Sequence, residues 1–194
     1  MMPIIISGKI GSGKSTFCDF FRRDNYTILS ADIIAKELIR NNNEVKRKLL
    51  DAFGDIIMQN NQISFYEIRK LLCGSIKDKN IINSIVHPIF FKKLDNILTE
   101  VNKYKVVIEI PLIETCKYLK KNYILVFIKA DEEIRKSRYL LRENTRDNTF
   151  EILNGYQMTT KLSEGISDHV VTNNGSIDEL YVSYNKLCND LNYE

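Results

Sequence analysis

Short apolar runs, separated by helix-like segments, are the main pattern along this chain. Such runs cover residues 3–7, 26–30, 106–108, 123–128 and 169–172. They are rich in β-branched and aromatic residues, and their length is typical of strands that are buried on both faces. The pattern therefore predicts five buried strands.

Helical periodicity fills most of the chain between these runs. We expect helices over residues 14–23, 31–40, 131–142 and 147–162, the last weakened by Gly155, and a C-terminal helix capped by residues 176–179. Strands that alternate with helices indicate a parallel sheet with helices on both faces. The chain is therefore predicted to be an α/β protein.

The segment from about residue 44 to residue 103 shows helical periodicity without a clear strand. Ser64 and Glu67 have the spacing of a capping box, which predicts that a helix begins there. Pro88, directly after His87, suits the first turn of another helix. We expect a helical lobe of about sixty residues, inserted between the second and third strands.

Composition and charge narrow the classes of protein that fit. The 194 residues are 44% hydrophobic, enough for a sizeable core, and 28 basic residues against 25 acidic ones give a net charge of only +3, spread along the chain. The four cysteines have no C-x-x-C spacing, and two histidines make no zinc pattern. No apolar stretch approaches the roughly 18 residues that span a bilayer. We expect a cytoplasmic protein, a monomer or small homo-oligomer, that binds neither nucleic acid nor membrane.

Residues 8–15 read Gly-Lys-Ile-Gly-Ser-Gly-Lys-Ser and satisfy the phosphate-binding pattern G-x-x-x-x-G-K-S. A predicted strand precedes this P-loop and a predicted helix follows it, as the pattern requires. Glycines let successive N–H groups converge on phosphate oxygens, and the helix adds the positive end of its dipole. We expect Lys14 to bridge the β- and γ-phosphates of ATP, Ser15 to bind Mg²⁺ and Thr16 to meet the α-phosphate. The residues predicted to contact the nucleotide here are Gly11, Ser12, Gly13, Lys14, Ser15 and Thr16.

The rest of the chain favours a small-molecule kinase over other P-loop proteins. Asn185–Lys186 is followed by Leu187 and Cys188, so the N-K-x-D guanine motif of GTPases is absent. Asp32 follows the second predicted strand, and ligands of such folds bind beyond the carboxyl ends of the strands. It could accept a proton from an attacking hydroxyl. It could equally be an acid that favours the helix dipole.

Several further segments together resemble the dephospho-CoA kinase family over nearly the full chain. The segments that carry the resemblance are Ile10–Thr16, Ala31-Asp32-Ile33-Ile34-Ala35, His87-Pro88, Pro111-Leu112-Ile113-Glu114 and Asn173-Asn174-Gly175. The first is common to many P-loop proteins, whereas the next three at these separations are much more specific.

The resemblance implies a P-loop NTPase-type α/β/α fold in three parts. These are a nucleotide core of about residues 1–31, 105–130 and 165–194, a helical CoA-binding lobe of about 32–104 and a lid of about 131–164. It implies transfer of the ATP γ-phosphate to the ribose 3′-hydroxyl of dephospho-CoA, with Asp32 as the base.

The resemblance also implies roles for residues outside the P-loop. Arg138 and Arg142 match the two lid arginines, and at a spacing of four they share a helix face that can close on the phosphates. Arg146 is a lesser candidate in the lid turn. Asn173 matches the asparagine beside the adenine of ATP.

Two further residues keep alternative interpretations. Glu109, where the family usually has aspartate, either holds a Mg²⁺-bound water or orients the acceptor, or is a partly buried structural acid. His87 either touches CoA or packs inside the lobe.

The sequence departs from the family pattern at three places: Ser30 replaces a common aspartate, Lys9 replaces a loop glycine, and Thr159-Thr160 replaces the charged residues after Gln157.

Two other functions fit the same fold. A nucleoside or deoxynucleoside monophosphate kinase would need arginines in the inserted lobe, and only Arg47 and Arg69 lie there. A non-catalytic ATP-binding regulator would not need Lys14, Ser15 and Asp32 intact.

Overall fold

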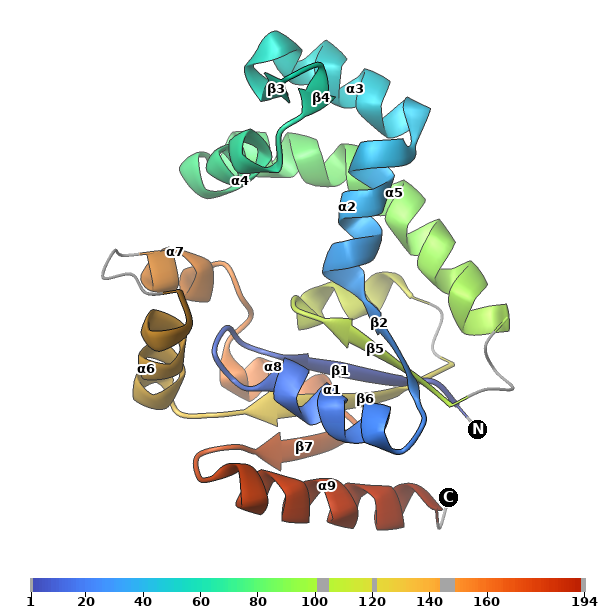
Figure 1. Cartoon of the computed structure of the whole chain (residues 1–194), viewed down its shortest axis with the longest axis vertical. Helices are drawn as coiled ribbons and strands as arrows, with labels where there is room; N and C mark the ends of the chain where they lie inside the picture. The colour runs from blue at the N-terminus through green and yellow to red at the C-terminus, as the bar shows by residue number, and fades with distance from the viewer. Residues whose placement is uncertain (1, 101–104, 120–121, 144–148, 193–194) are drawn as a thin grey trace. The chain divides into compact units, whose positions relative to one another are not determined.

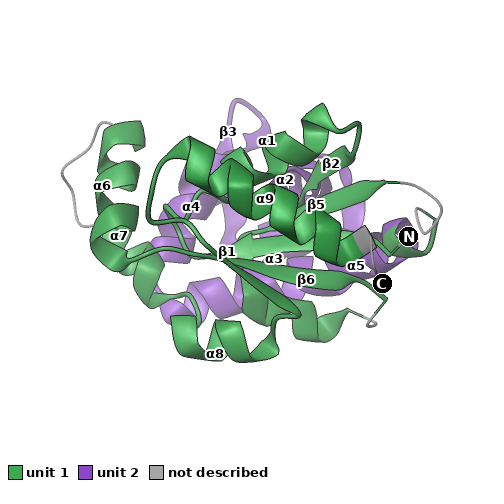
Figure 2. Ribbon diagram, turned by 90° about the horizontal axis from the view of Figure 1, so that it is seen from below, with its two compact units in different colours: residues 1–30, 98–194 green, residues 31–97 purple. Residues whose placement is uncertain are grey.

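The computed structural model describes residues 2–100, 105–119, 122–143 and 149–192. It divides into two compact units (Figure 2). The first comprises Met1–Ser30 and Leu98–Glu194, and the second comprises Ala31–Ile97. We describe each unit by itself.

A five-stranded parallel sheet forms the centre of the first unit (Figure 1). Its strands are β1 (Ile4–Gly8), β2 (Thr27–Ser30), β5 (Val106–Ile110), β6 (Ile124–Lys129) and β7 (His169–Thr172), in the order β2-β5-β1-β6-β7. The predicted α/β class, the parallel sheet and its five strands are confirmed. The chain leaves β1 for one side of the sheet and later fills the other side with β6 and β7, so the carboxyl end of β1 is the topological switch point.

Helices cover both faces of this sheet (Figure 2). The helices of the unit are α1 (Lys14–Arg23), α6 (Glu132–Glu143), α7 (Thr149–Gly155), α8 (Thr160–Ile166), α9 (Ile177–Asn192) and the 3-10 helix η2 (Ile113–Tyr118). Of these, α6 and α7 lie beyond the ends of the strands and not over a face (Figure 1). Helices α1 and α9 pack on one face through a cluster of aromatic rings, in which Tyr184 lies 5.8 Å from Phe17 and 4.8 Å from Phe21, centroid to centroid. Because these rings and the strand residues beneath them are buried, α1 is firmly fixed directly after the P-loop.

The second unit is mainly helical. It contains α2 (Ala31–Asn41), α3 (Asn43–Phe53), the 3-10 helix η1 (Gly54–Ile57), β3 (Met58–Gln59), β4 (Gln62–Ile63), α4 (Phe65–Gly74) and most of α5 (Ile76–Glu100). Its core includes Val45, Leu49, Ile57 and Leu94, all fully buried. The predicted cap at Ser64 is confirmed, since its hydroxyl accepts a hydrogen bond from the Glu67 N–H at 3.5 Å.

The prediction that this segment lacks strands is wrong, because β3 and β4 form a small antiparallel hairpin. Asn60 and Asn61 form its turn with φ of 50° and 59°. Two consecutive residues at positive φ are what a tight hairpin turn needs, and asparagine tolerates this conformation better than most residues. The strands have only two residues each, too few for an alternating pattern to be visible in the sequence.

Two predicted helix boundaries are also wrong. Pro88 lies inside α5 and does not begin a helix. An apolar stripe at a spacing of four residues runs past the proline on both sides, and its burial outweighs the one lost backbone hydrogen bond. The stripe consists of Ile82, Val86, Phe90, Leu94 and Leu98.

The single helix predicted over residues 147–162 is two helices in the described part of the chain. Helix α7 ends at Gly155, whose missing side chain makes it a poor helix residue. Helix α8 begins afresh after Thr159, whose hydroxyl accepts from the Leu162 N–H at 3.5 Å.

None of the helices in the described ranges combines the length and the apolar character that crossing a bilayer requires.

Candidate active site

The P-loop follows β1 and owes its curvature to two glycines with positive φ. Gly11 has φ of 76° and Gly13 has φ of 91°, a region that residues with a side chain rarely adopt. Space is also limiting. A Cβ atom at Gly11 would lie 2.2 Å from the Arg135 carbonyl oxygen, and one at Gly13 would lie 2.3 Å from Nδ2 of Asn173. Both positions therefore require glycine for two independent reasons.

The side chain of Lys14 folds back over the loop that precedes it. Its Nζ donates to the carbonyl oxygens of Gly8 at 2.8 Å and Lys9 at 3.2 Å. Ser12 is fully buried, and its Oγ has no hydrogen-bond partner among the described residues. A buried hydroxyl without a partner is rare in proteins, and a phosphate oxygen in the loop would supply one.

Lys9 stands in the loop where the family has glycine. It is half-buried, and burial lowers the pKa of its ammonium group, with the positive charge of Arg135 as the second cause.

Ser15 and Glu109 meet at the carboxyl edge of the sheet. The Ser15 hydroxyl, at the start of α1, donates to Oε1 of Glu109 at 2.8 Å. Glu109 lies on β5, opposite Ile6 of β1 on one side and Ser30 of β2 on the other. A hydroxyl and a carboxylate are oxygen ligands of the kind that Mg²⁺ prefers. The pair thus fits a magnesium ion or one of its water ligands.

Asn173 ties the end of β7 to the P-loop. It is buried, at 6% exposed, and its Nδ2 donates to the carbonyl oxygen of Ser12 at 2.8 Å. Arg138, on α6, donates to the carbonyl oxygens of Asn173 at 2.9 Å and Gly175 at 3.2 Å. The loop after β7 is therefore held between the P-loop and α6.

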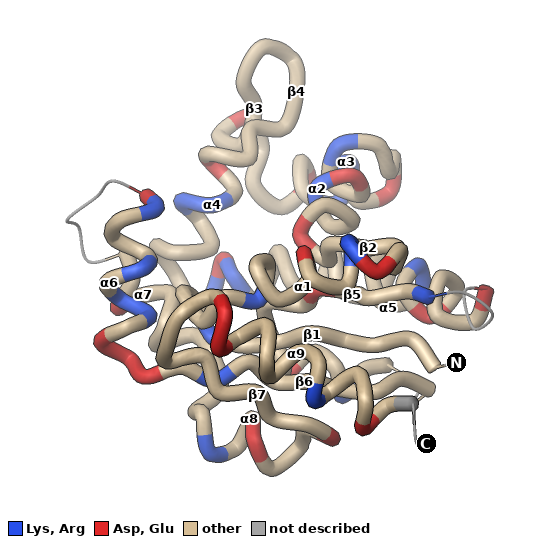
Figure 3. Tube along the Cα trace, turned by 60° about the horizontal axis from the view of Figure 1, so that its bottom comes forward, with Lys and Arg blue, Asp and Glu red and all other residues tan. Residues whose placement is uncertain are grey.

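Arg142 lies four residues after Arg138 on the same helix. Its side chain is 62% exposed, and its Nε donates to Oε1 of Glu143 at 2.8 Å. Helix α6 begins with acidic residues, and basic residues follow toward its end (Figure 3). The third candidate, Arg146, lies outside the described residues.

Asp32 and His87 belong to the second unit. Asp32 is exposed in the first turn of α2, two residues after Ser30. His87 is half-buried on α5, with its ring centroid 5.3 Å from that of Phe91 in a T-shaped arrangement. The structure thus groups the P-loop, Glu109, Arg138 and Asn173 in the first unit and places these two residues in the second.

Comparison with known proteins identifies the family. The model of the family described as dephospho-CoA kinase matches residues 2–179. The chain belongs to the dephospho-CoA kinase family.

Individual relatives agree with this assignment. A dephospho-CoA kinase of the gamma-proteobacterium EBAC31A08 is 30% identical over 190 residues, which cover 96% of this chain and 95% of that protein. The crystal structure of TT1252 from Thermus thermophilus has a TM-score of 0.80 at 23% identity, covering 98% of this chain and 97% of that one. A dephospho-CoA kinase from Campylobacter jejuni has a TM-score of 0.72 at 18% identity, covering 97% and 96%. Both solved structures have the same fold as this chain.

Dephospho-CoA kinases are ATP-dependent phosphotransferases of the P-loop class, and their reaction is the final step of coenzyme A synthesis. The predicted family, enzyme class and fold are therefore confirmed.

Two residues of this dephospho-CoA kinase-type site were not predicted. Arg135, on α6, is only 2% exposed and donates from Nη1 to the carbonyl oxygen of Ile10 at 3.1 Å. Gln157 accepts from the N–H of Ile10 at 2.7 Å. In the sequence Arg135 resembles any helical arginine, and Gln157 stands out only because it precedes a departure from the family pattern. Nothing in the sequence shows that both contact the same loop residue.

His87 provides a prediction on stability. Burial lowers the pKa of its imidazole, with Lys79 as the second cause, so the folded protein binds fewer protons here than the unfolded chain does. The contribution of His87 to the free energy of unfolding is therefore complete above about pH 6.5, the pKa of histidine in the unfolded chain. This contribution decreases as the pH falls below that value and through the lower pKa that His87 has in the folded protein. Urea melts at pH 5, 6 and 7 should show a flatter pH dependence for His87→Phe than for the wild type. An unchanged slope would show that folding does not lower the pKa of His87.

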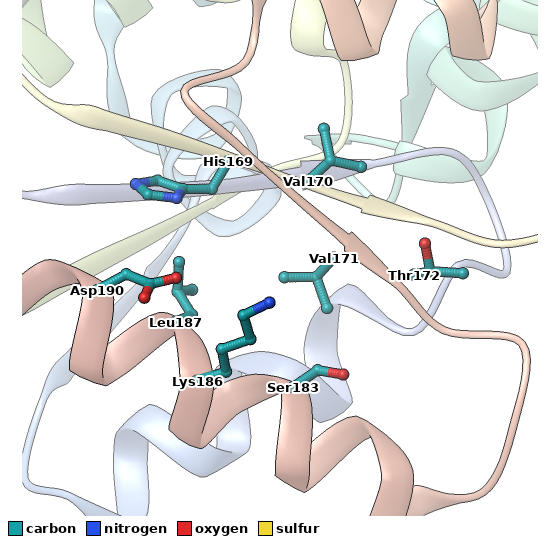
Figure 4. Close-up of a pocket in the computed structure, with 8 residues that line it drawn as sticks. All are labelled: His169, Val170, Val171, Thr172, Ser183, Lys186, Leu187 and Asp190. Carbon is teal, nitrogen blue, oxygen red and sulfur yellow. The ribbon is translucent and has the colours of Figure 1, made fainter.

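A groove of about 250 Å³ lies between β7 and α9, lined by His169, Thr172, Ser183, Lys186 and Asp190 among others (Figure 4). None of the predicted site residues lines this groove. The groove is therefore separate from the candidate active site, and Lys186 can serve as a control residue.

Proposed function

We propose that this chain transfers the γ-phosphate of ATP to the 3′-hydroxyl of the ribose in dephospho-CoA, with Mg²⁺ as the metal cofactor. The observation that carries the proposal is a P-loop whose Lys14 folds back over the loop and whose Ser15 donates to Glu109 of β5. It occurs in a chain that the family matches over residues 2–179. A phosphate-binding loop with an acidic partner for its serine is what phosphoryl transfer from a nucleotide requires.

In this proposal the loop residues from Gly11 to Thr16 bind the phosphates through their N–H groups. Lys14 exchanges its two carbonyl partners for β- and γ-phosphate oxygens, because a phosphate is the stronger partner for an ammonium group. Ser15 and Glu109 are the residues that would hold Mg²⁺. When bound, the ion neutralises the negative charge of the phosphates.

Asp32 is proposed as the base that takes the proton of the 3′-hydroxyl. It lies two residues beyond Ser30, which pairs with Glu109 in the sheet. Two residues of chain span at most about 7 Å, which limits the distance between the Cα atoms of Asp32 and Ser30. Its exposed position in the first turn of α2 leaves the carboxylate accessible to an acceptor.

The remaining predicted residues keep their proposed roles. Residues 32–104 are proposed as the acceptor lobe, with His87 as a contact, and residues 131–164 as the lid that brings Arg138 and Arg142 to the phosphates. Asn173 is proposed to lie beside the adenine of ATP, and its hydrogen bond to the P-loop supports this position. A cytoplasmic location and a monomer or small homo-oligomer remain predictions.

The experiment that tests the proposed function is an acceptor panel with ATP and Mg²⁺. The panel contains dephospho-CoA, AMP, deoxynucleoside monophosphates and pantetheine. We expect ADP release to depend on dephospho-CoA alone. Faster turnover of AMP or a deoxynucleoside monophosphate would replace the proposal with a monophosphate kinase.

Arg142 provides a test of the lid. Because Arg142 is exposed and pairs with its neighbour Glu143, we expect it to meet the γ-phosphoryl group mainly in the transition state. Arg142→Ala should therefore lower kcat by about tenfold or more and change the KM for dephospho-CoA little. Lys136→Ala, on the same helix, is the control. A change confined to the KM for dephospho-CoA would assign Arg142 to the acceptor site.

A further inference from the structure

The peptide groups on either side of Ile10 are each bound by a side chain from the segment that contains α6 and α7. The N–H of Ile10 donates to Oε1 of Gln157 at 2.7 Å, and the carbonyl oxygen of Ile10 accepts from Nη1 of Arg135 at 3.1 Å. Ile10 lies in the middle of the P-loop, so its backbone conformation determines how the loop presents its N–H groups. Two side chains on one residue's backbone fix both of its peptide planes.

Both side chains are themselves held in place. Arg135 is buried, and the same Nη1 also donates to Oδ1 of Asn154 at 2.9 Å. Its Nε donates to the carbonyl oxygen of Ala130 at 3.1 Å, and its Nη2 donates to Oε2 of Glu132 at 3.4 Å. Gln157 donates from Nε2 to the carbonyl oxygen of Pro111 at 3.0 Å. An arginine loses about 2 kcal/mol of side-chain entropy when it is fixed, so a buried arginine with four acceptors indicates a specific structural requirement.

The geometry of a trans peptide shows what this arrangement does. The C=O and N–H of one peptide group point in opposite directions, and the described residues contain no cis bond. Arg135 binds the C=O of Ile10, so the N–H of Gly11 in the same peptide points away from Arg135. Gln157 binds the N–H of Ile10, so the C=O of Lys9 points away from Gln157, where it accepts from Ser12 N–H and Lys14 Nζ.

We propose that Arg135 and Gln157 are positioning residues that pre-form the phosphate cradle, by fixing the two peptide groups around Ile10 so that the N–H of Gly11 is directed to phosphate. The proposal deepens the proposed function, since it concerns the same ATP site. It predicts that nucleotide affinity depends on side chains that touch no nucleotide. Without these two side chains the loop would have to become ordered when ATP binds, and this entropy cost would lower the affinity for ATP.

The test uses Arg135→Met and Gln157→Leu, which keep side-chain bulk and remove the hydrogen bonds. Binding of Mg–ADP is measured by calorimetry, followed by KM and kcat. Each variant should bind Mg–ADP about fivefold to tenfold more weakly, which corresponds to the loss of one or two hydrogen bonds. The KM for ATP should rise by a similar factor, while the KM for dephospho-CoA stays within about twofold. Arg135→Lys should lie between Arg135→Met and the wild type, because it can restore one of the bonds.

Controls separate this effect from general destabilisation. Lys136→Met removes the neighbouring cation of α6, which pairs with Glu151, and should bind Mg–ADP like the wild type. Glu132→Gln removes the exposed carboxylate beside Arg135, and should also bind normally if the contact with Ile10 is what counts. The double variant of Arg135 and Gln157 should lose less affinity than the sum of the single losses, because both act on adjacent peptide groups.

Wild-type affinity for Mg–ADP in folded Arg135→Met or Gln157→Leu would overturn the proposal. Fully additive losses in the double variant, or a lysine variant no better than methionine, would also contradict it. Should Arg135→Met fail to fold, Gln157→Leu alone decides, since Gln157 is only half-buried. Binding of Mg–ADP needs no acceptor, so a failure of this proposal is distinguishable from an error about dephospho-CoA.

Discussion

Asp32→Asn is expected to reduce kcat with dephospho-CoA by roughly 10²–10⁴-fold. A ribose hydroxyl must lose its proton as the new phosphorus–oxygen bond forms, and asparagine cannot accept it. The substitution preserves shape and some hydrogen bonding at an exposed position, so the fold should be unaffected. Affinity for ATP should stay the same or increase slightly, because a negative charge near the γ-phosphate has been removed. Initial rates, and calorimetry with a non-hydrolysable analogue of Mg–ATP on the same preparation, measure both.

Glu37→Gln is the matched control for Asp32→Asn, since Glu37 is an exposed carboxylate on the same helix that pairs with Lys93. It should keep wild-type turnover. A loss of less than about tenfold in Asp32→Asn would show that Asp32 is not the base. That result would favour an acceptor that is already ionised, such as a nucleoside monophosphate.

Lys14→Ala should lower turnover by at least about 10²-fold, the scale expected when a charged contact to the transferring phosphoryl group is lost. Lys14 is only half-buried and its tip donates to carbonyl oxygens of the loop, so the variant should remain folded with a near-normal melting temperature. Steady-state kinetics and a thermal melt of the variant provide the comparison.

The control for Lys14→Ala is Lys186→Ala, which removes an exposed lysine from the groove between β7 and α9. It should behave like the wild type. A folded Lys14→Ala enzyme with near-normal kcat would refute the role assigned to the P-loop.

The features that the sequence predicted well are those encoded by neighbouring residues. The P-loop follows from eight consecutive residues, and the five strands follow from short apolar runs that need no knowledge of their partners. The cap at Ser64 likewise depends on a residue three positions away. Local patterns of this kind survive folding because burial and local geometry favour the same conformation.

The features that the sequence did not reveal depend on distant residues or on very short segments. Arg135 contacts Ile10 across 125 positions, and Gln157 contacts it across 147. Pro88 was placed at a helix start because proline favours that position, but the apolar stripe of α5 overrides this preference. The hairpin at Asn60 and Asn61 has too few residues to show strand periodicity.

The central claim is that the acceptor atom is the ribose 3′-oxygen of dephospho-CoA, and the position of the new phosphate tests it most directly. The product of a reaction with ATP, Mg²⁺ and dephospho-CoA should be isolated and examined by phosphorus NMR with proton coupling. We predict a single new phosphomonoester coupled to the 3′-proton of the ribose, identical to authentic coenzyme A. A phosphate on the 2′-oxygen or on the pantetheine arm, or no phosphorylated product beside rapid phosphorylation of AMP, would contradict the account.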